Sequence, residues 1–179
     1  MLNFGKSFQG YWDDRLAGLV DLKLPLQGAA VLDVGCNMGI IGYELCKSEP
    51  GFYHGVERMR VHAFVARMLF KGVRSEHRID RINIAKENVR KKVLHDAYDI
   101  VLYLAVHQHL KKQLGEEAAN DVFLDLLNRC SGCLVFRGPD YDSVTALAEK
   151  KGFARGEVFS SSRINPICIF RRVQGHPGP

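Results

Sequence analysis

The apolar residues of this chain fall into two kinds of pattern that alternate along its length. The first is a short continuous apolar run, such as Tyr98–Ala105, which is typical of a strand covered on both faces. Runs of this kind predict strands at residues 29–34, 52–56, 77–84, 98–105 and 133–136. Two later runs, 154–159 and 167–172, flank a serine-rich loop and predict a hairpin at the end of the chain.

The second pattern places apolar residues three and four positions apart, which predicts amphipathic helices. Between residues 61 and 69 the template is complete, and it predicts a helix with a buried apolar stripe made of Val61, Phe64, Val65, Met68 and Leu69. Similar spacing predicts helices at 8–20, 40–45 and 119–127, and a charged helical stretch that ends at Val93. Asp142 and Ser143 are expected to cap a helix that runs through Lys151.

Strands that alternate with helices predict an α/β protein with a doubly wound, Rossmann-like sandwich. We expect a mostly parallel seven-stranded sheet, to which the terminal hairpin adds one antiparallel strand. No repeat or linker divides the chain, so a single domain is expected over residues 1–174, with a helical lead-in at 1–28 and a flexible tail at 175–179. Ligands of such sheets bind beyond the carboxyl ends of the strands, where the strand order reverses.

The composition of the 179 residues, 46% hydrophobic and 25% charged, is that of a globular protein and excludes a disordered or fibrous chain. No apolar run reaches the roughly 18 residues that span a bilayer, and the first residues lack the apolar segment of a signal peptide. We therefore expect a cytoplasmic protein without membrane association.

The five cysteines are an odd, scattered set, which favours reduced thiols. Cys130 and Cys133 have the spacing of half a zinc site or of a redox pair. No second pair of cysteines or histidines follows at ligand spacing, so we interpret this spacing as chance and predict no metal site.

Positive charge is concentrated in one part of the chain. Residues 58–92 contain eleven basic and three acidic residues, whereas the whole chain has a net charge of only +5. Such a segment is either a solvated helix face or a surface that attracts RNA or anionic substrates.

The turn after the first predicted strand, Asp33–Gly39, is the expected ligand loop. Gly35 allows a sharp turn, Gly39 allows close approach of the following helix, and Asn37 tolerates a left-handed backbone. The spacing Gly-x-x-x-Gly is not the dinucleotide fingerprint. Asp33 would repel a pyrophosphate but suits an ammonium group, which favours a ligand with a cationic amino-acid part.

Glu57 ends the second predicted strand. A carboxylate at this position can accept hydrogen bonds from the two vicinal hydroxyls of a ribose. The alternative is that Asp33 and Glu57 are loop acids that cap nearby amides.

Three motifs in this order, Val31–Gly39, Gly55–Glu57 and Tyr98–Leu110, resemble those of the class I methyltransferases that use S-adenosylmethionine. The resemblance covers residues 29 to 172 and implies S-adenosylmethionine as cofactor. It also implies cofactor-binding residues, which are Asp33, Gly35, Cys36, Asn37 and Gly39 around the methionine half, Glu57 at the ribose, Arg58 and Met59 beside the adenine, Asp80 or Asn83 at its amino group, and Leu104, Ala105 and Val106 as an apolar wall.

Family members that act on small molecules often carry a histidine after the fourth strand, and Val106–Leu110 resembles their pattern. His109 is therefore a candidate general base, although a histidine at such a position more often caps a helix or holds the cofactor loop. A small-molecule acceptor is the favoured interpretation because the chain lacks the loop used on exocyclic amines of nucleic-acid bases. RNA, attracted by segment 58–92, is the alternative. A third hypothesis is a partner subunit that binds the cofactor without catalysis.

Overall fold

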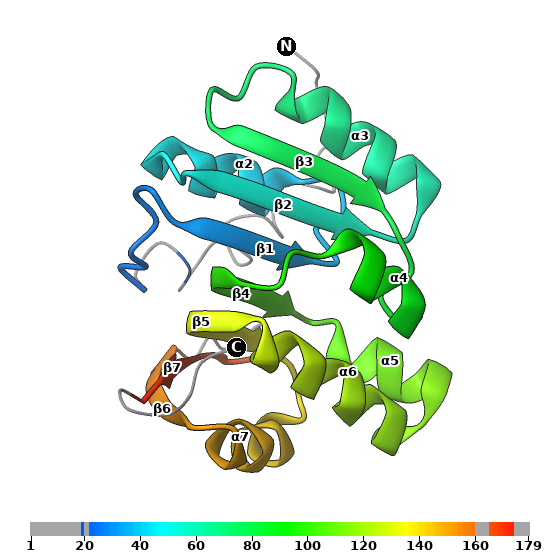
Figure 1. Ribbon diagram of the computed structural model, residues 1–179, viewed down its shortest axis with the longest axis vertical. Coiled ribbons are helices and arrows are strands. Elements are labelled where there is room, and N and C mark those ends of the chain that lie inside the picture. The colour runs from blue at the N-terminus through cyan, green and yellow to red at the C-terminus, as the bar shows by residue number, and fades with distance from the viewer. Residues whose placement is uncertain (1–18, 20–21, 160–164, 174–179) are drawn as a thin grey trace.

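The computed structural model describes Leu19, residues 22–159 and residues 165–173 (Figure 1). The predicted sandwich is confirmed, since the strands form one seven-stranded sheet in the order β3-β2-β1-β4-β5-β7-β6. β7 runs antiparallel to both of its neighbours, β5 and β6, while the other pairs are parallel. The strands are β1 (Ala30–Val34), β2 (Phe52–Glu57), β3 (Glu76–Arg81), β4 (Tyr98–Leu104), β5 (Cys130–Arg137), β6 (Phe153–Phe159) and β7 (Ile167–Arg172).

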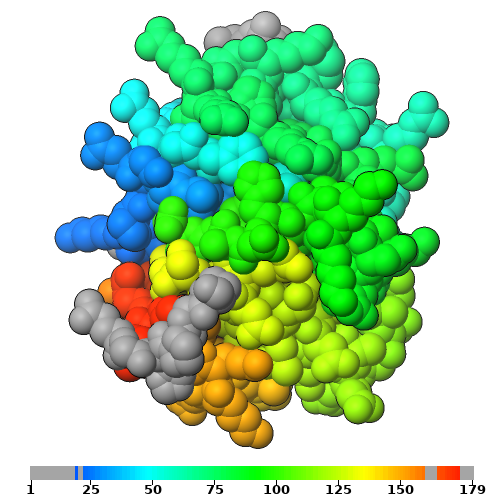
Figure 2. All heavy atoms as spheres, viewed as in Figure 1, coloured from blue at the N-terminus to red at the C-terminus, as the bar shows by residue number. Residues whose placement is uncertain are grey.

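Helices cover both faces of the sheet. The described helices are α2 (Ile40–Leu45), the 3-10 turn η1 (Cys46–Ser48), α3 (Arg60–Phe70), α4 (Glu87–Val93), α5 (His107–Leu114), α6 (Glu116–Asn128) and α7 (Tyr141–Lys150). α2 and α3 contribute to the apolar cluster on one face, and α5, α6 and α7 to the cluster on the other. Side chains of α4, α6 and α7 form much of the surface seen in Figure 2.

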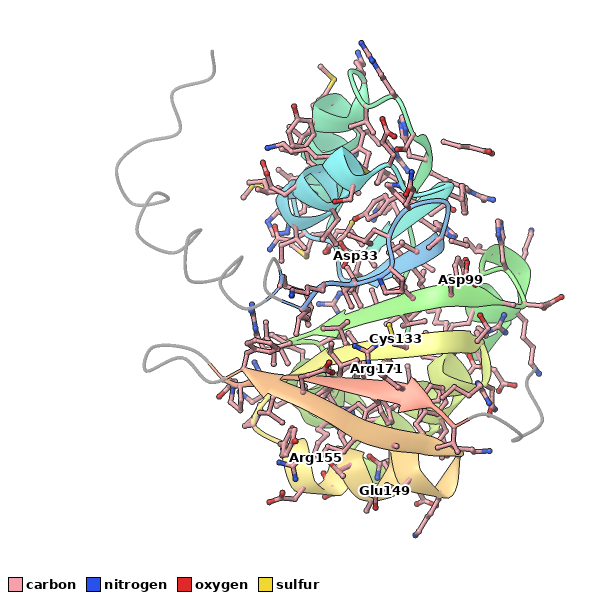
Figure 3. All side chains as sticks on the ribbon, turned by 90° about the vertical axis from the view of Figure 1, so that its left-hand side faces the viewer. Asp33, Asp99, Cys133, Glu149, Arg155 and Arg171 are labelled. Carbon is pink, nitrogen blue, oxygen red and sulfur yellow. The ribbon has the colours of Figure 1, made fainter. Side chains whose placement is uncertain are left out.

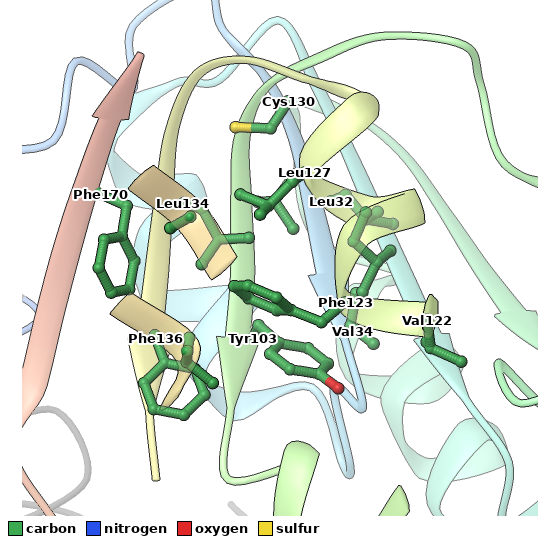
Figure 4. Packing of buried hydrophobic residues seen from close by; sticks show 14 of the residues in the cluster. Leu32, Val34, Tyr103, Val122, Phe123, Leu127, Cys130, Leu134, Phe136 and Phe170 are labelled. Carbon is green, nitrogen blue, oxygen red and sulfur yellow. The ribbon is translucent and has the colours of Figure 1, made fainter. Parts of the chain in front are cut away.

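The alternation of side chains along each strand separates the two clusters. Leu134 and Phe136 of β5 pack with Phe123 of α6 on one face (Figure 4), whereas Cys133 and Val135 belong to the other cluster. All five residues of the predicted stripe of α6 are buried, as its spacing indicated; they are Ala119, Val122, Phe123, Leu126 and Leu127.

Cys130 and Cys133 belong to opposite faces of the sheet. Both lie on β5, where positions three apart point to opposite sides, and Figure 3 labels Cys133 on that strand. Both thiols are free and buried. The two thiols therefore do not converge on one site, and within the described ranges no group of three His, Cys, Asp or Glu side chains is arranged to hold a metal ion.

The buried stripe predicted for α3 is wrong at three of its five positions, while Val65 and Leu69 are half-buried. Val61, Phe64 and Met68 are 68%, 61% and 47% exposed, and the buried residues are instead Ala63, Ala66 and Phe70. The reason is a close approach between two helices: a Cβ atom on Gly39, at the start of α2, would lie 3.0 Å from the Cβ of Ala66. Only a small side chain fits at position 66, and Phe70 packs beside it, whereas Val61, Phe64 and Met68 lie on the outer side of α3.

Two helix details also differ from expectation. α5 has no counterpart among the predicted helices because its sequence is mostly polar and buries only His107 and Leu110. α7 begins at Tyr141 with Asp140 as N-cap, so Asp142 and Ser143 lie in its first turn, where the Ser143 hydroxyl donates a 3.0 Å hydrogen bond to the Asp140 carbonyl. The predicted helix at 8–20 and the tail at 175–179 lie outside the described residues, apart from Leu19.

Candidate functional site

A cavity of about 1230 Å³ opens at the carboxyl ends of the central strands. It lies where the strand order reverses, since β1 pairs with β2 on one side and with β4 on the other. Its walls come from the loops that follow β1, β2, β3 and β4, from α5, and from Arg137 at the end of β5. The sequence-predicted residues that line it are Asp33, Gly35, Cys36, Asn37, Glu57, Arg58, Met59, Asn83, Leu104, Ala105, Val106 and His109.

The loop after β1 takes a left-handed backbone at Gly35, Asn37 and Gly39, with φ of 73°, 54° and 80°. At Gly35 a side chain is also excluded by contact, because its Cβ would lie 2.8 Å from the side chain of Val106. The amides of Gly35 and Cys36 donate hydrogen bonds to the Val56 carbonyl, which fixes the loop against the end of β2. The loop thus fits closely between the ends of β2 and β4.

Gly39 itself does not line the cavity. Its place is the contact with Ala66 and Phe70 of α3, which sets the distance between α2 and α3. Cys36 does line the cavity, and burial raises the pKa of its thiol far above the ordinary value.

Asp33 is a buried carboxylic acid at the end of β1, only 3% exposed. Burial raises its pKa to about 6, partly opposed by a hydrogen bond from the Tyr53 hydroxyl at 2.6 Å, while the nearby charge of Glu57 raises it further. A buried acid of this kind is stabilised in its ionised form by a cation placed beside it. Tyr53 was not singled out from the sequence, because its contact with Asp33 depends on the pairing of β1 with β2.

Gly42 of α2 makes room for this tyrosine. A Cβ atom at Gly42 would overlap the hydroxyl group of Tyr53. Residues from β1, α2 and β2 therefore position the carboxyl group of Asp33 at the cavity.

Glu57, which is 9% exposed, connects the first two loops of the site. One carboxylate oxygen accepts a 3.1 Å hydrogen bond from the backbone N–H of Asn37, and the other accepts a 2.7 Å hydrogen bond from the backbone N–H of Met59. Each carboxylate oxygen can accept more than one hydrogen bond, so both can still receive a donor from a ligand in the cavity.

The structure separates the two candidates for the adenine contact. Asn83 lines the cavity, between Ile82 and Ile84. Asp80 does not line it, and its carboxylate instead lies 3.0 Å from Nε2 of His54 and 2.6 Å from Nε of Arg78.

The wall after β4 contains a strained residue. Ala105 has a φ of 58°, in the left-handed region that a side chain disfavours by roughly 1–2 kcal/mol, and its amide donates a 2.7 Å hydrogen bond to the Arg137 carbonyl. Such strain is concentrated at functional sites. Across the cavity, the Arg58 guanidinium donates a 2.9 Å hydrogen bond to the side chain of Gln113 on α5.

No family model and no curated protein matches this chain. Solved structures do match over nearly its whole length. Magnesium protoporphyrin IX methyltransferase from Synechocystis PCC 6803 with bound S-adenosylhomocysteine superposes with a TM-score of 0.69 at 18% identity, covering 92% of this chain and 83% of that one. The chain has the class I methyltransferase fold.

Two further methyltransferase structures show the same fold. The N-methyltransferase NodS from Bradyrhizobium japonicum WM9 in complex with S-adenosylhomocysteine gives a TM-score of 0.67 at 15% identity, covering 89% of this chain and 86% of that one. A putative RNA methyltransferase from Pyrococcus horikoshii gives 0.68 at 15% identity, covering 91% and 82%. Neighbours with differently named activities share this fold, so the fold alone does not select the acceptor.

In this methyltransferase fold the two histidines after β4 take different positions. His109 is exposed on α5 and lines the cavity. His107 is buried against Tyr103, whose hydroxyl lies 3.3 Å from Nδ1 of His107, and burial lowers the pKa of this imidazole.

Several lining residues were missed from the sequence. Arg137 is 6% exposed at the end of β5, and its signal was a single charge directly after the apolar run Leu134–Phe136. The others lie in stretches without a distinctive pattern, and they include His62 on α3, Lys112 and Gln113 on α5, and Asn165 before β7.

Proposed function

We propose that this protein is an S-adenosylmethionine-dependent methyltransferase that acts on a small molecule. The observation that carries the proposal is the presence of two buried carboxylates, Asp33 and Glu57, in one cavity at the reversal point of the sheet. They are connected through the loop after β1, because Glu57 accepts a hydrogen bond from the backbone N–H of Asn37.

The lining residues fit the chemical groups of S-adenosylmethionine. Asp33 would hold the ammonium group and Glu57 the ribose hydroxyls, while Arg58 and Met59 would flank the adenine. Of the two candidates for the adenine amino group we favour Asn83, because Asp80 does not line the cavity. When bound, S-adenosylmethionine supplies an electrophilic methyl group on its sulfonium, from which a lone pair of the acceptor displaces S-adenosylhomocysteine.

The residues at the end of β4 would shape the reacting part of the site. Leu104, Ala105 and Val106 line the cavity and would limit the access of water to the methyl group. His109 lies in the same cavity and would accept the proton of an acceptor that has one to lose. Much of the rate would come from alignment of the acceptor with the methyl group, so the proposal does not depend on a general base.

Binding of S-adenosylhomocysteine, measured by calorimetry, is the first test. We expect Glu57→Ala to weaken binding by about 1–3 kcal/mol through loss of charge-assisted hydrogen bonds. The matched control is Glu76→Ala, which removes an exposed acid of β3 outside the cavity and is expected to leave affinity unchanged. The proposal fails if the wild-type protein does not bind this ligand, and Glu57 is excluded from the site if its variant binds equally well.

RNA is the second candidate acceptor, favoured by the basic residues of segment 58–92. Most of that segment forms α3, β3 and α4, whereas Arg137 and α5 line the cavity beside β4 and β5. Incubation with methyl-labelled cofactor and either a metabolite extract or total RNA distinguishes the two candidate acceptors by which pool becomes labelled. A protein that binds S-adenosylhomocysteine and labels neither pool would be a partner subunit without catalysis.

A further inference from the structure

We propose that the methyl acceptor is a small anion, recognised by Arg137 with help from Lys112. This inference rests on the proposed function and adds the chemical class of the acceptor. Its starting point is the distribution of charge along the cavity wall.

The described lining contains only two acids, Asp33 and Glu57. The same lining contains three permanently charged bases, Arg58, Lys112 and Arg137. Both acids lie at the carboxyl ends of β1 and β2, beside the proposed cofactor. Arg137 is the last residue of β5 and Lys112 belongs to α5, so the charged side chains that the described wall has on this side of the cavity are positive.

Arg137 occupies a fixed place beside the wall after β4. Its Cα pairs with that of Leu104 on one side and that of Ile167 on the other, and its carbonyl accepts the hydrogen bond from Ala105. The side chain is 6% exposed and lines the cavity. A guanidinium held away from bulk water interacts more strongly with an anion than an exposed one does, and its planar fork matches carboxylate and phosphate oxygens.

The charge balance points to the same class of acceptor. With both acids ionised, the described lining residues carry one more positive than negative charge, and S-adenosylmethionine adds another, since its sulfonium and ammonium outnumber its single carboxylate. An anionic acceptor would interact favourably with the cations of this described lining. The buried position of Arg137 favours a small carboxylate or phosphate compound over a nucleic-acid backbone.

Equilibrium dialysis tests the inference without relying on turnover. The protein, saturated with S-adenosylhomocysteine, is dialysed against a metabolite extract divided by anion exchange into a neutral fraction, a carboxylate fraction and a phosphate fraction. Mass spectrometry then identifies the compounds that the protein retains. We expect retention from one of the two acidic fractions and labelling of the retained compound by methyl-labelled cofactor.

Variants of Arg137 and Lys112 test whether these two side chains are responsible for retention of the compound. Arg137→Gln is expected to reduce retention at least tenfold while S-adenosylhomocysteine affinity changes less than twofold. Lys112→Glu is expected to reduce it about fivefold, and this exposed position keeps the test decisive if Arg137→Gln does not fold. Arg74→Gln, at an exposed arginine outside the cavity, is the control and should behave as wild type.

The outcomes separate this inference from the proposed function. Retention and labelling of a neutral compound would overturn the inference and leave the methyltransferase proposal intact, as would retention that neither variant reduces. Labelling of RNA in place of a small compound would overturn the inference together with the small-molecule acceptor. Absence of S-adenosylhomocysteine binding would refute the proposed function itself.

Discussion

The hydroxyl of Tyr53 donates a 2.6 Å hydrogen bond to the carboxylate of Asp33 inside the protein. The two residues lie on neighbouring strands, β2 and β1, and both are almost completely buried. Burial raises the pKa of Asp33 to about 6, and the hydrogen bond limits that rise. The proposed ligand of the ammonium group is thus an acid that titrates close to neutral pH.

Cofactor binding should therefore release protons. An ammonium group beside Asp33 favours its ionised form and lowers its pKa, so affinity for S-adenosylhomocysteine is expected to rise as the pH increases from 5 to 7. Calorimetry at pH 6 in buffers of different ionisation enthalpy measures the protons released. An affinity that is flat across this range would contradict the assignment of Asp33.

The tyrosine provides a matched pair of variants for the same measurement. Tyr53→Phe removes the hydrogen bond that holds the pKa of Asp33 down, so the rise in affinity should move to higher pH. Tyr43→Phe changes a half-buried tyrosine of α2 outside the cavity and should leave the pH dependence of the affinity unchanged.

Gly42→Ala is expected to destabilise the fold by about 1–3 kcal/mol, the usual cost of overpacking, because the added methyl group overlaps the Tyr53 hydroxyl. Urea unfolding measures the change. Gly72→Ala is the control: nothing lies within 4 Å of its added Cβ, so its stability should be unchanged or up to about 1 kcal/mol higher. Equal free energies of unfolding for the two variants would show that the contact between α2 and Tyr53 does not contribute to stability.

His54 should make the fold less stable in mild acid. Its imidazole is fully buried between the Tyr98 hydroxyl, 2.6 Å from Nδ1, and Asp80, 3.0 Å from Nε2, and burial lowers its pKa below the ordinary 6.5. Below pH 6.5 the unfolded chain takes up the proton more readily, so this contribution to stability is complete above pH 6.5 and decreases as the pH falls.

The measurement compares free energies of unfolding at pH 7.5 and 5.5 for wild type and His54→Gln. The variant removes the titrating group, so it should lose less stability on acidification than wild type does. Asp33 acts in the opposite direction in both proteins, because its raised pKa stabilises the fold at low pH and that contribution is lost as the pH rises through about 6. A variant with the same change as wild type would exclude His54 as the source.

His109→Ala is expected to lower turnover by about 10²-fold or more, in the range of general-base removal, while leaving affinity for S-adenosylhomocysteine unchanged. Methyl transfer to the retained acceptor and calorimetry provide the two readouts. Gln108→Ala, at the neighbouring position outside the cavity lining, is the control. Equal losses of turnover and affinity would assign His109 to holding the cofactor loop.

The sheet could be predicted from the sequence because short apolar runs such as Tyr98–Ala105 and turns such as Asp33–Gly39 are local signals. The exposed face of α3 could not, since the spacing of Val61, Phe64 and Met68 identifies an apolar side of a helix but not whether another element covers it. Small residues, Gly39 and Ala66, decided the packing, and their contact joins segments far apart in the chain.

In the candidate site, too, some features could be predicted from the sequence and others depend on contacts between distant segments. Asp33 lies near the end of β1 and Glu57 ends β2, so their meeting at one edge of the sheet follows from the order of elements. The contacts of Tyr53 with Asp33 and of Arg137 with Ala105 depend on strand register, which periodicity does not determine.

All five cysteines of the chain are buried and free, and burial raises the pKa of Cys46 and Cys130 to about 12 and that of Cys133 to about 11. The thiolate is the form that attacks iodoacetamide and displaces its iodide, so the native protein should resist this reagent while the unfolded chain gains up to five carbamidomethyl groups. The protein therefore carries an intrinsic reporter of unfolding, and the mass added per molecule would show whether ligand binding keeps the chain closed.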